Sequence, residues 1–102
     1  MNRDSLLNKI SNGFQVGCRF SFLNKDKVCW SSVGLQKWEG KYKVYVDEIL
    51  ESMMSSEEYL REEIIEFNTI DDALIFIEQN TNAKINDLAP CKGQRIFNPS
   101  HS

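Results

Sequence analysis

The stretch from residue 33 to residue 46 reads VGLQKWEGKYKVYV and carries the pattern of a β-hairpin. Glu39-Gly40 is typical turn chemistry, because glycine tolerates the backbone conformations that a tight connection between strands requires. After this turn, Tyr42, Val44 and Val46 alternate with two lysines and a tyrosine. An apolar residue at every second position indicates a strand with one buried face. The stretch therefore predicts two antiparallel strands joined by a tight turn.

A further strand is predicted on the N-terminal side of this hairpin. In FQVGCRFSFL (residues 14–23), Val16, Cys18, Phe20 and Phe22 alternate with smaller or polar residues. The following NKDK is rich in turn-forming side chains, so it should connect this strand to the next one.

The next segment, VCWSSVGLQKW (residues 28–38), has an interrupted alternation. Val28 and Trp30 share one parity, whereas Val33 and Leu35 share the other. Because a bulge inserts one residue into a strand and changes which side chains share a face, we expect one at the two serines between these pairs.

Two helices are predicted, one near each end of the chain. RDSLLNKISNG (residues 3–13) has Asp4 as a candidate N-cap, an apolar stripe and a terminating Gly13. FNTIDDALIFIEQNT indicates a second helix near residues 70–81, with Thr69 as its N-cap and two aspartates in its first turn.

Residues 57–67, EEYLREEIIEF, fit either a helix or a strand, and we interpret them as a strand because the second helix begins so clearly after them. A short final strand is expected at QRIF (residues 94–97). Short connections favour neighbouring strands in sequence order. The chain is therefore expected to be a single α+β domain over residues 1–102, with an antiparallel meander of four to five strands and both helices packed on it.

Composition restricts the class of protein. The chain has 102 residues, 41% of them apolar, which suffices for one core. No apolar run approaches the ~20 residues that span a bilayer, and the first residues lack the apolar segment of a secretory signal. Cys18, Cys29 and Cys91 are odd in number and lack a C-x-x-C spacing. We therefore expect free thiols in a cytoplasmic protein, with no metal and no cofactor.

Charge is concentrated in one part of the chain. Residues 47–72 hold ten acidic residues and one basic residue, whereas residues 1–46 hold three acidic and eight basic ones. Such an acidic block repels nucleic acids and anionic membranes and attracts basic proteins. It can also be a solvated face with no partner. The candidate partner-binding residues are Asp47, Glu51, Glu57, Glu58, Tyr59, Glu62, Glu63 and Glu66.

Aromatic side chains are candidate anchors for such an interface, since Trp and Tyr are enriched at binding hot spots. We expect Trp30 and Tyr42 to pack in the core instead. Tyr45 alternates away from Val44 and Val46 and is expected to be exposed.

Catalytic motifs are not apparent. The chain contains no phosphate-binding glycine loop, no H-E-x-x-H and no G-x-S-x-G. Its single histidine, His101, lies in a polar tail, which makes a Cys91–His101 dyad a weak candidate. Carboxylate pairs can hydrolyse glycosides, but a small sheet leaves little room for the cleft they need. We therefore expect no enzymatic activity.

The runs VGLQKWEGKYKVYVDEIL and EFNTIDDALIFIEQNT, with the acidic segment between them, resemble small immunity proteins of bacterial toxin systems. The closest likeness is to those of contact-dependent growth inhibition, and it covers roughly residues 28–81. The resemblance implies a cytoplasmic, non-enzymatic protein that binds and neutralises a cognate toxin domain. Many such toxins are nucleases with basic clefts, so the carboxylates would stand in for phosphate. The family implies no shared binding residues. An adaptor or regulator that binds another basic protein is the alternative.

Overall fold

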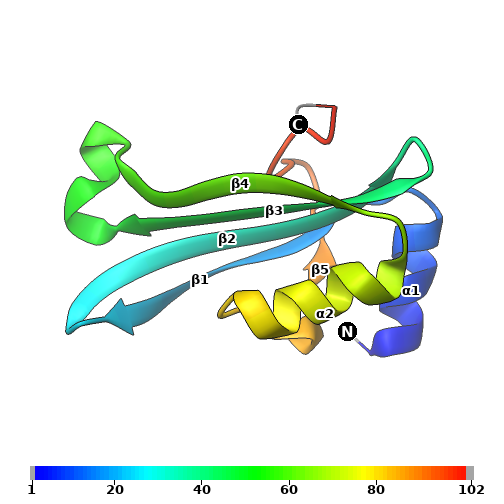
Figure 1. Cartoon of the computed structure of the whole chain (residues 1–102), viewed down its shortest axis with the longest axis horizontal. Helices are drawn as coiled ribbons and strands as arrows, with labels where there is room; N and C mark the ends of the chain where they lie inside the picture. Colours follow the sequence, from blue (N-terminus) through cyan, green and yellow to red (C-terminus); the bar gives the residue numbers. More distant parts are fainter. Residues whose placement is uncertain (1, 101–102) are drawn as a thin grey trace.

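The computed structural model describes residues 2–100, which form a five-stranded antiparallel sheet with two α-helices on one face (Figure 1). The strand order is β4-β3-β2-β1-β5, so the predicted α+β meander is confirmed. In chain order the elements are α1 (Arg3–Ser11), β1 (Val16–Asn24), β2 (Lys27–Trp38), β3 (Lys41–Leu50), the 3-10 helix η1 (Glu51–Ser56), β4 (Tyr59–Phe67), α2 (Ile70–Asn80), the 3-10 helix η2 (Ile85–Asp87) and β5 (Ala89–Pro90).

Two tight turns set the register of the first three strands. Lys25 and Asp26 connect β1 to β2 with φ values of 51° and 65°, and Glu39 and Gly40 connect β2 to β3 with φ values of 51° and 78°. Two successive residues with positive φ form the turn whose twist matches that of the flanking strands. The expected hairpin is therefore confirmed.

The expected bulge in β2 is wrong. Ser31 and Ser32 pair in unbroken register with both β1 and β3, and the irregularity of the sheet lies instead between Glu48 and Ile49 of β3, opposite β4. The change of parity in β2 has another cause. Val33 and Leu35 point to the face that the helices cover, whereas Val28 and Trp30 point to the opposite face. The apolar residues thus change side along the strand without a bulge.

Residues 59–67 form a strand, so the helical alternative for this segment is wrong. β4 pairs with β3 in antiparallel register, with Glu62 opposite Asp47 and Phe67 opposite Tyr42. Glu57 ends η1 in the left-handed conformation at φ 55°, and this residue redirects the chain into the edge strand.

The helix caps agree with the prediction in one of two cases. The Thr69 side chain accepts a hydrogen bond from the Asp72 N–H, 3.1 Å away, so the expected cap of α2 is confirmed. Asp4 is not the cap of α1, because Asn2 accepts from the Ser5 N–H at 2.8 Å and Asp4 lies in the first turn. No helix in residues 2–100 has the length and apolar content needed to cross a membrane.

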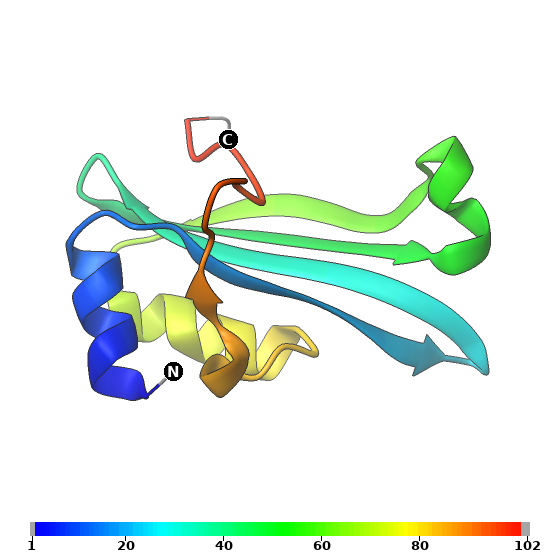
Figure 2. The same ribbon diagram turned by 180° about the vertical axis from the view of Figure 1, so that it is seen from behind.

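The core lies between the sheet and the helices. α1 and α2 cover the same face of the sheet, near the end opposite η1 (Figures 1 and 2). Their apolar stripes pack on the alternating residues of the three central strands, as the period of two in those strands requires. The buried core residues are Leu6, Ile10, Val16, Val33, Leu35, Val44, Val46, Ala73, Leu74, Ile77, Ala83, Ile85 and Leu88.

The opposite face of the sheet, called the second face below, is covered in part by residues 96–99, which we name the strap (Figure 2). QRIF is therefore not a strand: β5 is Ala89–Pro90, which pairs with Val16 and Gly17. The strap crosses above Gly17 and Gly34, which pair directly. A Cβ at Gly34 would lie 2.8 Å from the Phe97 ring, so the strap needs a residue without a side chain there.

Gln15 fixes the strap to the sheet. Its side chain is 6% exposed. Its Oε1 accepts from the Ile96 N–H at 2.7 Å, and its Nε2 donates to the Phe97 carbonyl at 2.9 Å. The same amide also donates to the Gln36 side chain, 2.9 Å away. A buried amide bonded in this way holds the strap in one position.

Candidate functional site

The acidic block is divided between the two faces of the sheet. Residues that lie directly opposite each other in an antiparallel pair point to the same side. Glu62 lies opposite Asp47, and Tyr59 lies opposite Ile49, all on the second face. Glu63 lies opposite the buried Val46 and points to the helix-covered face.

The second face carries a row of polar residues across four strands: Arg19, Ser32, Asp47 and Glu62, each opposite the next. The Arg19 Nε donates to the Ser32 Oγ at 2.9 Å, and the Ser32 N–H donates to the Asp47 Oδ1 at 2.7 Å. We call these four residues the polar row. It brings together two of the predicted residues, Asp47 and Glu62, with two that sequence reasoning did not single out.

Tyr45 joins the two carboxylates of this row. Its hydroxyl oxygen lies 2.9 Å from the Asp47 Oδ2 and 2.9 Å from the Glu62 Oε2. A phenol has one proton to donate, so it can satisfy one carboxylate at a time. The two carboxyl groups therefore compete for one phenolic donor, and the cluster holds two acidic side chains beside one guanidinium.

The pKa values of the cluster reflect this arrangement. Burial raises the pKa of Asp47 above its usual value of 3.8, and the neighbouring Glu62 raises it further, while the Tyr45 hydroxyl, the Ser32 N–H and Arg19 lower it. Burial also raises the pKa of Tyr45, as do its hydrogen bonds to the two carboxylates. Tyr45 is therefore the proton donor of the cluster at neutral pH.

Tyr45 is not exposed, contrary to expectation. It is half-buried, because the Phe97 ring of the strap stacks on it with centroids 5.6 Å apart and planes inclined by 10°. The strap thus covers the row Gly17–Gly34–Tyr45 and leaves the polar row at its margin. Tyr42 packs against the core, as expected.

A groove lies next to the polar row, on the side away from the strap. It has a volume of about 150 Å³, and its apolar walls come from Trp30, Ile49, Met54 and Tyr59. Trp30 is therefore a half-buried residue of the second face and not part of the core, contrary to expectation. The Trp30 Nε1 donates to the Glu51 Oε1 at 3.3 Å, which places a predicted acidic residue at the rim of the groove.

Three predicted acidic residues cluster around η1, at the end of the sheet that the helices do not reach (Figure 1). Glu51 begins η1, and Glu57 and Glu58 connect it to β4. All three are exposed, as are Met53 and Met54 within the 3-10 helix. This end of the molecule combines negative charge with exposed apolar surface.

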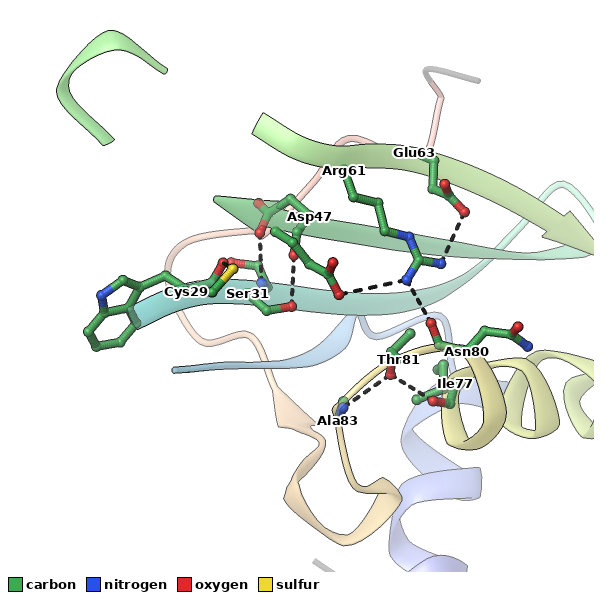
Figure 3. Close-up of polar contacts among 12 residues, drawn as sticks. Cys29, Ser31, Asp47, Arg61, Glu63, Ile77, Asn80, Thr81 and Ala83 are labelled. Carbon is green, nitrogen blue, oxygen red and sulfur yellow. Dashed lines mark hydrogen bonds and ion pairs between the residues drawn. The ribbon is translucent and has the colours of Figure 1, made fainter. Parts of the chain in front are cut away.

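The remaining two predicted residues each face a cation. The Glu66 Oε1 lies 2.9 Å from the Lys43 Nζ, and Lys43 lowers the pKa of Glu66 by a hydrogen bond and by its charge. Glu63 lies 3.2 Å from the Arg61 Nη2 (Figure 3). Arg61 also donates to the Asn80 carbonyl at 2.6 Å, so this ion pair belongs to the contact between β4 and the end of α2.

Within residues 2–100, no three His, Cys, Asp or Glu side chains are grouped as metal ligands. Cys18, Cys29 and Cys91 are free thiols, as predicted, and burial raises the pKa of Cys18 to about 11. His101, the histidine of the candidate dyad, lies outside the described residues.

Arg19, Ser32 and Met54 were missed as site residues. The turn lengths contained a usable signal for the first two. With two-residue turns at residues 25–26 and 39–40, Arg19 must lie opposite Ser32, and Ser32 opposite Asp47. No comparable signal exists for Met54, whose position depends on the path of η1.

Comparisons of the chain with protein-family models, with curated proteins and with solved structures found no match. The resemblance to immunity proteins therefore stays a prediction.

Proposed function

We propose that this chain is an immunity-type protein, which binds a basic toxin domain and neutralises it in the cytoplasm of the cell that makes both. The observation that carries the proposal is the second face near η1. There, Asp47 and Glu62 share one phenolic proton beside an apolar groove. An acidic surface with apolar anchors suits a cationic partner.

The electrostatics of the free chain support this proposal. Like charges at directly opposite positions of a sheet destabilise it, so Asp47 opposite Glu62 has a cost for folding. A cationic partner would turn this repulsion into attraction. Nuclease clefts are basic because they bind phosphate, and carboxylates can occupy the same cationic positions. The proposal assigns no reaction to the chain itself.

The test is growth protection. The open reading frame immediately upstream of the gene is expressed from an inducible promoter, alone and together with this chain. We expect growth arrest in the first case and growth in the second, with a copurifying complex that weakens as salt rises. If the upstream product is harmless while a different basic protein copurifies with the chain, the chain is an adaptor or regulator.

A further inference from the structure

The second face shows how it accepts an extended segment, because it already holds one. The strap places the Phe97 ring over Gly34 and against Tyr45, and Gln15 holds its backbone. One aromatic ring packed over Gly34, together with hydrogen bonds between Gln15 and the backbone of the strap, therefore keeps this segment in place.

The half of the same face nearer η1 also has a groove that an aromatic ring could enter. The helices lie on the other side of the sheet, and the strap lies over the rows nearer α1 (Figures 1 and 2). The groove beside Trp30 and Ile49 is open at Tyr59 and Met54, whose surfaces are 42% and 47% exposed. Toward the β1–β2 turn, the directly paired Leu23 and Val28 extend this apolar surface.

Charge determines which kind of segment fits this groove. Asp47 and Arg19 line the groove, Glu62 lies opposite Asp47 on the neighbouring strand, and Glu51 lies at the rim beside Trp30. Arg19 is the cation of the polar row, and its Nε is bonded to Ser32. Three carboxylates against one guanidinium favour a cationic ligand and disfavour an acidic peptide or a phosphate.

We propose that this half of the second face, from the polar row to Leu23 and Val28, is the docking surface for an extended segment of a basic protein. An aromatic or aliphatic side chain of that segment enters the groove. An arginine or lysine beside it reaches Asp47 and Glu62. The inference rests on the proposed function and specifies its interface.

The two parts of the surface have different roles. Large apolar side chains buried at the centre of an interface supply most of the affinity. Carboxylates at the margin speed the encounter and make it sensitive to salt. The apolar groove should therefore control dissociation, and the acidic residues should control association.

A display experiment tests the inference without a known partner. The full chain is used to select binders from a library of random twelve-residue peptides, and the enriched peptides are synthesised. We expect sequences with an aromatic or aliphatic residue next to arginine or lysine. In an NMR titration, their addition should shift the backbone amide signals of residues in the groove and the polar row, such as Trp30, Asp47 and Tyr59.

Matched variants locate the binding surface. Tyr59→Ala and Glu62→Lys should each weaken peptide binding by at least about tenfold, the effect of losing a hot-spot contact. Ile75→Ala and Glu78→Lys make the same kinds of change on α2, where Ile75 is 49% exposed, and should change affinity by less than about twofold. Circular dichroism serves as the control and should show that all four variants are folded.

The inference is overturned if the library yields no binders, if the enriched peptides lack cations, or if they bind equally well to Tyr59→Ala and Glu62→Lys. The growth experiment then judges the proposed function separately. Protection by the wild type and equally by both variants would retain the function and remove this surface. If the wild-type chain does not protect the cells, the proposed function is wrong, whatever the peptides show.

Discussion

Asp47→Asn should make the free chain more stable. In the wild type, the single Tyr45 proton serves two carboxylates. An asparagine at this position can still accept from the Ser32 N–H, and its Nδ2 can donate to the Tyr45 oxygen. Tyr45 is then free to donate to Glu62, so each group has a complementary partner.

The magnitude follows from the geometry. Each carboxylate oxygen lies 2.9 Å from the Tyr45 hydroxyl, so the two are at most about 5.8 Å apart, twice that distance. At this separation two unit charges repel by about 0.7 kcal/mol in water and by about 3 kcal/mol at a dielectric constant of ~20. Because Glu62 is exposed and Arg19 attracts Asp47, we expect a net gain of about 1 kcal/mol in the free energy of unfolding. For a chain of this length that corresponds to a rise of about 4 °C in Tm.

The effect should depend on pH. The pKa of Asp47 is raised above 3.8, so its charge destabilises the fold at every pH above the folded-state pKa. As the pH falls through that value, the wild type takes up a proton more readily than its unfolded chain does. The stability difference between Asp47→Asn and the wild type should therefore shrink in acid and vanish below the ordinary pKa.

Urea unfolding followed by circular dichroism, at neutral and acidic pH, measures both effects. Glu63→Gln is the matched control, because Glu63 lies on the neighbouring strand β4 but faces a cation, Arg61, at 3.2 Å. Its removal should leave the free energy of unfolding unchanged or slightly lower. If Asp47→Asn is less stable than the wild type at neutral pH, the carboxylate stabilises the sheet and the reasoning is refuted.

Three further predictions address other parts of the molecule. Gly34→Ala should lower the free energy of unfolding by about 1–3 kcal/mol, because its Cβ meets the Phe97 ring; an unchanged urea midpoint would contradict the position of the strap. Cys18 should react with iodoacetamide more slowly than free cysteine at pH 8, since its pKa is about 11, and a reductant should leave Tm unchanged. Glu62→Lys with Glu66→Lys should keep the circular dichroism spectrum yet weaken partner binding by several kcal/mol, measured by calorimetry; wild-type affinity would exclude both residues from the contact with the partner.

Local signals in the sequence were sufficient for most of the fold. Two turns of two residues and an alternation of period two determine the order and register of β1, β2 and β3. The position of β4 follows less directly, because the 3-10 helix η1 separates it from β3 and a connection of that length does not determine a register. The strand itself is predictable only because Thr69, the N-cap of α2, marks so clearly where the helix begins.

The covering of the second face could not be predicted. QRIF is expected to be a strand, yet Ile96 and Phe97 bind to the sheet through their side chains and through Gln15. The cause lies in two glycines that are far apart in the sequence and adjacent in the sheet. Neither one has a turn beside it that would mark its role. The same non-local packing explains why Trp30 was assigned to the core and Tyr45 to the surface.

The strap has a consequence for the order in which the chain folds. The three central strands close over two-residue turns, and such short loops lose little entropy. The hydrogen bonds of Gln15 to the strap join residues separated by 81 and 82 positions, so they close the longest loop in this part of the fold. Contacts of that separation form late, because the chain must already be compact. Before the strap docks, the sheet would therefore expose the paired Gly17 and Gly34. This flat β-surface can associate with other unfolded chains until the Phe97 ring packs over it.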